Sequence, residues 1–193
     1  MTIKTPAQAL ALLKRKGILT LAAHVEGVPC FVEEVTGERV RGSWWGHPRG
    51  KLIFSLAESL EDSRQVLSLK LLDGKATFVA EALWPTLLAV VLEDGWRARR
   101  AQTLDAAAKG LWKAVERATR RGAQPAAVKA MEESLLVHCA SEHTEKGRHE
   151  KRLTSWAHWA KSRRLAPAKL SLEAALEKLK AAAGGNETGL HSC

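Results

Sequence analysis

The feature of this sequence that most constrains its fold is the Asp73-Gly74 pair, which separates two short apolar runs at 66–71 and 76–79. An Asp-Gly pair in this position predicts an antiparallel β-hairpin with a type I′-like turn. Such a turn needs positive φ at both central residues, and Asp and Gly tolerate it. The chain is therefore expected to contain at least one small β-sheet.

Helical patterns flank this hairpin on both sides. Apolar residues recur at helical spacing over about 5–17, 49–61 and 83–93. We interpret 29–35 as a further short helix, with a strand as the alternative, while the pattern over 18–25 does not decide between strand and helix. The resulting order of three helices, a hairpin and a helix is similar to that of winged-helix proteins, in which the hairpin is the wing.

The second half of the chain is expected to be entirely helical. Helices are predicted over 103–121, from Pro125 onward and over 170–183, and the basic stretch 143–164 carries two tryptophans on one helical face. The glycine-rich end at 184–193 is expected to be a disordered tail. We find no internal repeat.

The predicted fold class is therefore mainly α with a small β-hairpin, that is, α+β. A winged-helix-like module over 1–95, with a tryptophan-rich loop at 41–51, packs on a basic helical region over 96–183, and the tail at 184–193 follows. A chain of 193 residues with 46% hydrophobic residues is large enough to bury a substantial core.

The positive charge of the protein is concentrated in its second half. The net charge is +9, yet residues 1–94 carry 11 basic and 11 acidic side chains, which leaves 19 of the 30 basic and 10 of the 21 acidic ones in residues 95–193. A cationic face attracts polyanions and speeds their approach. We interpret this as nucleic-acid binding, with DNA favoured over RNA; the alternative is a solvated surface that keeps the protein soluble.

The loop over 41–51 reads R-G-S-W-W-G-H-P-R-G-K and brings two tryptophans, a histidine and three cations together. Its glycines and proline exclude a regular helix or central strand, so it is expected at the surface. An indole beside arginine can stack on a base or enter a duplex as a wedge. In extended backbone Trp44 and Trp45 would point to opposite faces, so the alternative is that one ring fills the core.

Candidate catalytic residues lie in or near this loop. His47 is the best candidate for a proton carrier, and a turn residue bonded to local backbone is the alternative. Lys51, with Lys70 and Lys75 on the hairpin as alternatives, is a candidate to form a Schiff base with an abasic sugar. Phosphate contact is the favoured role for all three lysines. Glu33, Glu34 and Glu38 precede the loop closely enough to orient a water or hold His47, and solvation of a helix surface explains them equally well.

The candidate nucleic-acid contacts are the loop indoles together with cations of the loop and of the basic half. They are Trp44, Trp45, Arg41, Arg49, Arg97, Arg99, Arg100, Lys113, Arg117, Arg120, Arg121, Lys151, Arg152, Arg163 and Arg164. The helix over 49–61 is apolar and acidic, so phosphates would repel it as a major-groove recognition helix. The loop before that helix is the favoured contact.

No metal or cofactor is expected. One cluster of candidate ligands runs from His138 to His149, but its spacing matches no standard zinc pattern, and His138 and Cys139 would point about 100° apart on a helix. The sequence lacks a glycine-rich phosphate loop, G-x-S-x-G and H-E-x-x-H, so nucleotide hydrolysis, hydride transfer and serine-type hydrolysis have no support. Its three cysteines form no C-x-x-C pair and imply no disulfide framework.

The run G-S-W-W-G-H-P-R-G-K-L-I-F, followed by D-G-K-A-T-F-V and A-L-W-P-T-L-L-A-V, resembles a bacterial family with the signature G-S-W-W-G-H-P-x-G-x-x-I-F. The resemblance covers about 29–95 and implies no particular activity. The order of elements is similar to that of winged-helix proteins, which include transcription regulators and some glycosylases of damaged DNA.

The sequence therefore predicts a DNA-binding protein that acts on damaged DNA, either a base-excision-type glycosylase or an abasic-site lyase. The alternatives are a non-catalytic winged-helix protein, as a regulator or nucleoid-type protein, and an adaptor that binds RNA or the ribosome. With no apolar segment long enough for a signal peptide or a membrane span, a cytoplasmic, nucleoid-associated bacterial protein without membrane contact is expected. The oligomeric state stays open.

Overall fold

The computed structural model describes residues 2–143 and 149–191. It is mainly α-helical with two small antiparallel sheets, which confirms the predicted α+β class. The first lobe consists of α1 (Pro6–Lys16), β1 (Ile18–Thr20), α2 (Phe31–Thr36), the 3-10 turn η1 (Trp44–Gly46), α3 (Gly50–Glu61), β2 (Val66–Leu72) and β3 (Lys75–Ala80). The second lobe consists of η2 (Glu81–Leu83), α4 (Trp84–Val91), α5 (Asp94–Gln102), α6 (Ala106–Arg117), α7 (Pro125–Ser134), β4 (Val137–His143), β5 (His149–Ser155), α8 (Trp156–Ser162) and α9 (Leu172–Ala182).

The first lobe has the three helices and the hairpin expected of a winged-helix-like module. Asp73 and Gly74 adopt φ of 46° and 72°, the positive values that a type I′ turn requires. The undecided stretch 18–25 contributes β1, which pairs with β3, so the sheet has the order β1-β3-β2. The stretch 29–35 is helical, as α2, and not a strand.

The three-stranded sheet is shared between two hydrophobic cores. Leu19 and Phe78 face α1, α2 and α3, whereas Ile18, Leu67 and Val79 belong to the core of the second lobe. This division follows from the strand period of two, which sends successive side chains to opposite faces. The hairpin therefore packs against both lobes and joins them.

The prediction that the second half is entirely helical is wrong between 137 and 155. This stretch forms β4 and β5, paired antiparallel from Val137 with Ser155 to His143 with His149. The strands were missed because their exposed positions carry charged residues and β5 buries only one large apolar side chain, Leu153. Such a strand gives little period-two apolar signal. Residues 144–148 of the predicted basic helix lie outside the described residues.

From α6 to β5 the second lobe has an order of elements similar to that of the first: a helix, a short β-bridge, a second helix and an antiparallel hairpin. After α6, Arg120 forms an isolated antiparallel bridge with Leu153 of β5, and α7 and the β4–β5 hairpin complete the series. In the first lobe β1 pairs in the same way with β3, the second strand of its hairpin. The sequence showed no repeat because the two units share topology but not residues.

Helix boundaries in the second lobe follow their capping residues. The helix expected over 103–121 is shorter, because the Asp105 carboxylate accepts from the Ala108 N–H at 2.7 Å and begins α6 there. α5 precedes it, begun by the Glu93 carboxylate, which accepts from the N–H groups of Gly95 and Trp96. The helices begun by Pro125 and expected over 170–183 are present as α7 and α9.

Residues 184–191 pack onto the protein instead of forming the disordered tail that the sequence predicts. Leu190 is completely buried, and its carbonyl accepts from the Trp96 indole N–H at 2.8 Å. The Gly189 N–H donates to the Leu71 carbonyl on β2 at 2.6 Å. Buried backbone polar groups need such partners, so these contacts hold the segment in place. Residues 192 and 193 lie outside the described residues.

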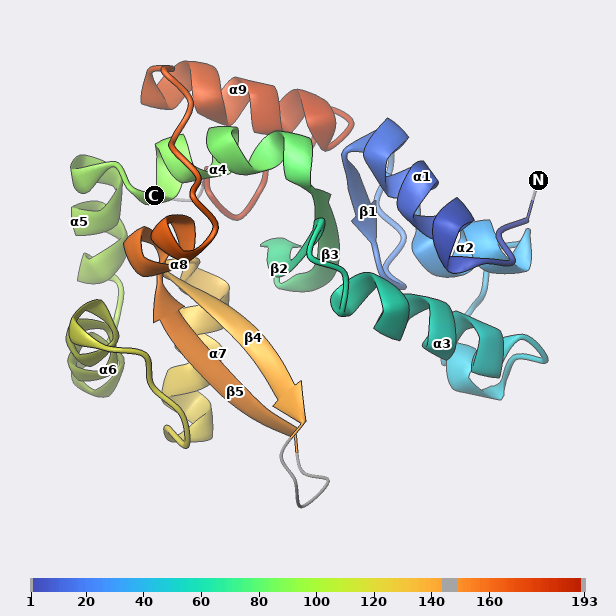
Figure 1. Cartoon of the computed structure of the whole chain (residues 1–193), viewed down its shortest axis with the longest axis horizontal. Helices are drawn as coiled ribbons and strands as arrows, with labels where there is room; N and C mark the ends of the chain where they lie inside the picture. The colour runs from blue at the N-terminus through green and yellow to red at the C-terminus, as the bar shows by residue number, and fades with distance from the viewer. Residues whose placement is uncertain (1, 144–148, 192–193) are drawn as a thin grey trace.

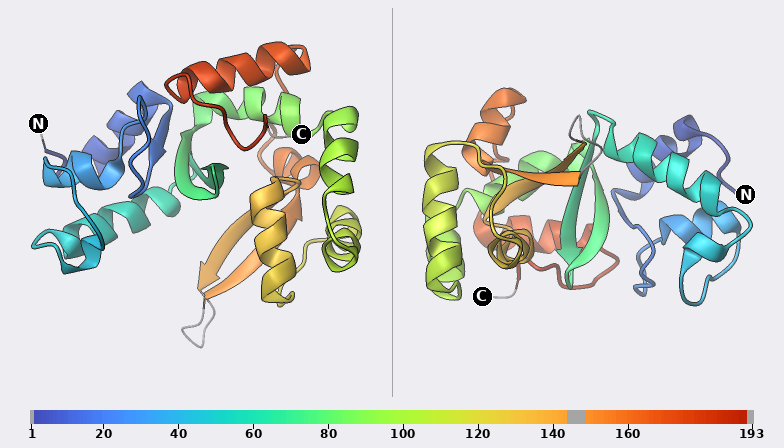
Figure 2. Two further views of the ribbon diagram at one scale, coloured as in Figure 1. Left: turned by 180° about the vertical axis from the view of Figure 1, so that it is seen from behind. Right: turned by 90° about the horizontal axis from the view of Figure 1, so that it is seen from below.

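The two lobes lie side by side along the longest axis of the molecule (Figure 1). α9 lies along α4 across the top of the second lobe, and α5 and α6 form its far end. The β2–β3 hairpin stands between α3 and the β4–β5 hairpin (Figure 2, right). In the described part of the chain, no helix combines the length and the apolar character needed to cross a membrane.

Candidate functional site

The tryptophan-rich loop forms an exposed aromatic tip at the start of α3. The rings of Trp44 and Trp45 are stacked, with centroids 4.2 Å apart and planes 20° apart, and Trp45 contacts Phe54 of α3 at 5.5 Å. Trp45 is 63% exposed and Phe54 45%, whereas Trp44 is half-buried against the core of the first lobe. The expectation of opposite ring directions is wrong, because residues 44–46 form a 3-10 turn and not extended backbone.

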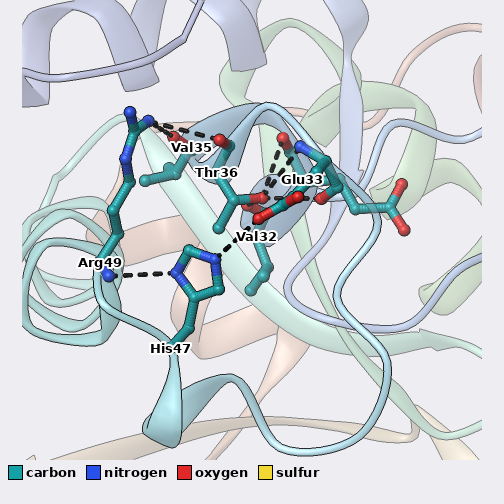
Figure 3. A network of polar contacts seen from close by, with 7 residues as sticks. Val32, Glu33, Val35, Thr36, His47 and Arg49 are labelled. Atoms are coloured by element: carbon teal, nitrogen blue, oxygen red, sulfur yellow. Dashed lines mark hydrogen bonds and ion pairs between the residues drawn. The ribbon is translucent and has the colours of Figure 1, made fainter.

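His47 holds this tip in place through both of its ring nitrogens (Figure 3). Its Nδ1 accepts from the Arg49 backbone N–H at 3.1 Å, so the ring proton lies on Nε2, which donates to Oε1 of Glu38 at 3.2 Å. The local backbone bond is the alternative predicted for His47, and Glu38 is one of the three glutamates that the sequence named as able to hold it. With both nitrogens engaged, the ring has no free position from which to accept a proton from a substrate.

The cations of the loop divide into one that supports the fold and two that are free to make contacts. The Arg49 guanidinium donates to the carbonyls of Val35 and Thr36 at the end of α2, at 2.8 and 3.4 Å, which ties α2 to α3. Arg41 and Lys51, which flank the indoles in the sequence, are exposed, and no residue described by the structure forms an ion pair with either. These two are therefore available to a phosphate.

A cleft of about 650 Å³ lies between the C-terminal end of α3 on one side and the β4–β5 hairpin with α8 on the other, and β2 also lines it. Its polar lining includes Lys70, Lys151, Arg152 and Arg163 among the predicted site residues. Both Lys70 and Lys151 contact the Glu132 carboxylate, at 3.1 and 2.7 Å. Burial opposes ionisation of Glu132, but the two ammonium groups outweigh it and lower its pKa.

His138 and Cys139 lie on the wall of this cleft. The His138 ring is buried against Trp156 and Trp159, with centroids 5.6 and 5.4 Å away. Burial, followed by the charges of Arg152 and Arg163, lowers the pKa of His138 to about 3, so the imidazole is neutral at physiological pH. Burial likewise raises the pKa of Cys139 to about 12, so its thiol is protonated and a poor nucleophile.

Several predicted contact residues of the second lobe serve the fold. Arg97 pairs with Glu116 at 2.8 Å and lies over the Trp112 ring. Arg100 is buried and donates to the carbonyls of Ser134 and Gly189, so it is not available to a ligand. The Glu142 carboxylate is shared by Arg121 at 2.9 Å and Arg152 at 2.7 Å. The remaining second-lobe contacts are exposed: Arg99, Lys113, Arg117, Arg120, Arg163 and Arg164.

The aromatic tip and the basic helices do not share one face, although the predicted nucleic-acid contacts include residues of both. The tip lies at the end of the first lobe, while α5 and α6 lie at the opposite end of the molecule (Figures 1 and 2). The catalytic candidates are separated as well. His47 and Lys51 belong to the tip, Lys70 lines the cleft, and Lys75 pairs with Asp73 at 3.5 Å at the hairpin turn.

Sequence reasoning missed Phe54 and the role of Glu132. A signal for Phe54 was present, because it lies off the apolar stripe formed by Ile53, Leu56 and Leu60, all of which are buried. A large apolar residue beside such a stripe is expected at the surface. Glu132 gave no comparable signal, since its two lysine partners come from β2 and β5, far away in the sequence.

Comparison of the chain with protein-family models, with curated proteins and with solved structures gave no match. The resemblance to the bacterial family with the G-S-W-W-G-H-P signature therefore stays a prediction.

Proposed function

We propose that this protein binds nucleic acid, DNA in preference to RNA, through the aromatic tip of its winged-helix-like module. The observation that carries the proposal is the stacked, exposed Trp45 ring supported by Trp44 and Phe54. A ring held from behind and beside by other rings loses little freedom when a base stacks on it, and such stacking contributes about 1–3 kcal/mol per base.

Charge at the tip is consistent with this role. Arg41 and Lys51 flank the indoles in the sequence and are exposed, so they can contact phosphates near a stacked or displaced base. The exposed face of α3 continues from Lys51 through Glu58 to Asp62 and becomes acidic toward its end. A duplex would therefore meet the first turn of α3 and the loop, not the whole length of the helix.

The protein acts, on this proposal, as a non-catalytic regulator or nucleoid-type protein. Loss of one stacked base should weaken duplex binding of Trp45→Ala about tenfold or more, measured by fluorescence anisotropy at fixed salt. Leu170→Ala is the matched control, because Leu170 is also exposed at 40% but lies in the second lobe. Equal affinity of both variants and the wild type for duplex DNA would refute the proposed interface. Stronger binding of RNA than of DNA would refute the stated preference.

Action on abasic sites is a second candidate function, favoured by the position of Lys70. This lysine lines the cleft, and a primary amine is the group that adds to the aldehyde of an abasic sugar. The amine would add to the C1′ aldehyde of an abasic sugar and lose water to form an imine. Borohydride should then trap a covalent adduct with wild-type protein and not with Lys70→Gln. An adduct that survives in Lys70→Gln would exclude Lys70 as the nucleophile.

A further inference from the structure

The wall of the interlobe cleft formed by β2, β4, β5, α7 and α8 carries more cations than carboxylates. Among its described lining residues, Lys70, Lys151, Arg152 and Arg163 stand against Glu132 and Glu142. Each carboxylate is already shared between two cations, Glu132 between the two lysines and Glu142 between Arg152 and Arg121. This side of the cleft therefore has a surplus of positive charge.

Arg163 is held at this wall by contacts that leave most of its donors free. Its Nη1 donates to the Arg64 carbonyl of the first lobe at 2.7 Å, and its guanidinium lies over the rings of Trp84 and Trp159 at 5.6 and 5.8 Å. Among the residues that the structure describes, no other carbonyl or carboxylate accepts from it. A guanidinium with five N–H groups and one such bond can bind an oxyanion without rearrangement.

His138 lies where the fields of Arg152 and Arg163 overlap. Both charges act against protonation of its ring, in addition to burial. A bound anion would oppose that field and could accept a hydrogen bond from the neutral ring. The free donors of Arg163 and the positive charges around His138 thus both favour an oxyanion between Arg152, Arg163 and His138.

The opposite wall of the cleft, at the C-terminal end of α3, carries free carboxylates. Glu58 of α3 and Asp62, the residue that follows α3, line the cleft, are exposed, and form no ion pair with any described residue. Carboxylates accept from the exocyclic amino groups of nucleobases. The cleft volume of about 650 Å³ is within the range of about 300–1,000 Å³ typical of small-molecule sites.

We propose that the interlobe cleft binds a nucleoside phosphate, with its phosphate at Arg152 and Arg163 and its base toward Glu58 and Asp62. The ligand is either a free nucleotide or one unit of a bound strand, and only the second case rests on the proposed nucleic-acid function. The acidic wall favours bases with an amino group, so adenine is preferred over uracil.

Calorimetric titration with adenosine 5′-monophosphate, uridine 5′-monophosphate and inorganic phosphate tests this site. We expect saturable binding of the adenosine nucleotide, weaker binding of the other two, and at least a tenfold loss in Arg152→Gln and Arg163→Gln. Arg152→Gln leaves Glu142 paired with Arg121, so the fold is retained; thermal unfolding checks this. Lys161→Gln, with the same charge change at an exposed position of α8 outside the cleft, should bind as the wild type does.

The absence of saturable binding of adenosine 5′-monophosphate would overturn the proposal, and so would unchanged affinity in both Arg152→Gln and Arg163→Gln. The variant Trp45→Ala tests the two proposed sites separately, because it should lose duplex binding at the aromatic tip and keep nucleotide binding in the cleft. Competition by a short single-stranded oligodeoxyadenylate, lost in Arg152→Gln, would identify the ligand as a strand unit. Lack of competition would identify it as a free nucleotide.

Discussion

At the scale of single residues, the bond from the Arg49 N–H to His47 Nδ1 has the i to i+2 geometry of an Asx turn. This identifies His47 as a residue that positions the aromatic tip. Its second contact, with Glu38, contributes little to stability because the Glu38 side chain is 70% exposed. The bond from the Arg49 N–H is therefore the contact of His47 that contributes more to stability.

Two substitutions of His47 should differ in stability for this reason. His47→Ala removes the acceptor of the Arg49 N–H and should lower the free energy of unfolding by about 1 kcal/mol. His47→Asn restores an acceptor at the same place and should be close to the wild type. Urea unfolding at neutral pH measures both. An equal loss of unfolding free energy in the two variants would show that the His47 ring stabilises the fold by some contact other than this hydrogen bond.

The neutral state of His138 implies a pH dependence of stability. The folded pKa of about 3 lies below the unfolded value of 6.5, so the unfolded chain binds more protons between these pH values. Stability should fall as the pH drops through this window, by about 2 kcal/mol from this group at pH 5. The free energy of urea unfolding should therefore depend less on pH in His138→Leu, whereas His158→Ala, at an exposed site, should behave like the wild type. An unchanged pH dependence in His138→Leu would contradict the assigned neutral state.

At the scale of elements, a close backbone approach attaches the chain after α9 to the first lobe. A Cβ on Gly184 would collide with the backbone of Gly27, and a Cβ on Gly27 would lie 2.8 Å from the Gly184 carbonyl oxygen. The Asn186 amide donates to the Glu26 carbonyl at 2.6 Å in the same contact. The segment after α9 is thus fitted to the loop between β1 and α2.

Single substitutions of Gly184 and of Gly185 by alanine distinguish the effect of this close contact on stability from the effect of backbone strain. Both glycines have positive φ, 65° and 87°, so both substitutions cost about 1 kcal/mol through the backbone. Only Gly184→Ala adds the collision, because nothing lies within 4 Å of a Cβ on Gly185. We expect Gly184→Ala to lower the free energy of unfolding by at least 1 kcal/mol more than Gly185→Ala, measured in urea. Equal losses would mean that the segment is not seated on the first lobe.

At the scale of the whole molecule, one sheet connects both cores, so the lobes should not unfold independently. Leu67 and Val79 pack into the second core while Phe78 packs into the first, and the Leu71 carbonyl accepts from Gly189 near the end of the chain. Far-ultraviolet circular dichroism and the fluorescence of the buried Trp84 and Trp96 should therefore report one urea transition with the same midpoint. Two separated transitions would show that the lobes fold as independent units.

Local sequence determined the elements whose formation depends on neighbouring residues. The Asp73-Gly74 turn, the start of α1 and the surface position of the loop before α3 follow from backbone preferences, which act over a few residues. The prediction of a local bond for His47 belongs to this group, because its partner Arg49 is two residues away.

Only the tertiary structure decided where these elements lie relative to one another. The predicted contacts combined the loop indoles with cations of the second half, but α5 and α6 fold to the opposite end (Figure 1), and Arg97 and Arg100 are used inside the second lobe. The cleft likewise joins Lys70, Glu132 and Lys151 from three distant segments. Such contacts depend on how the shared sheet packs between the two cores, and packing of this range leaves no periodic signal in the sequence.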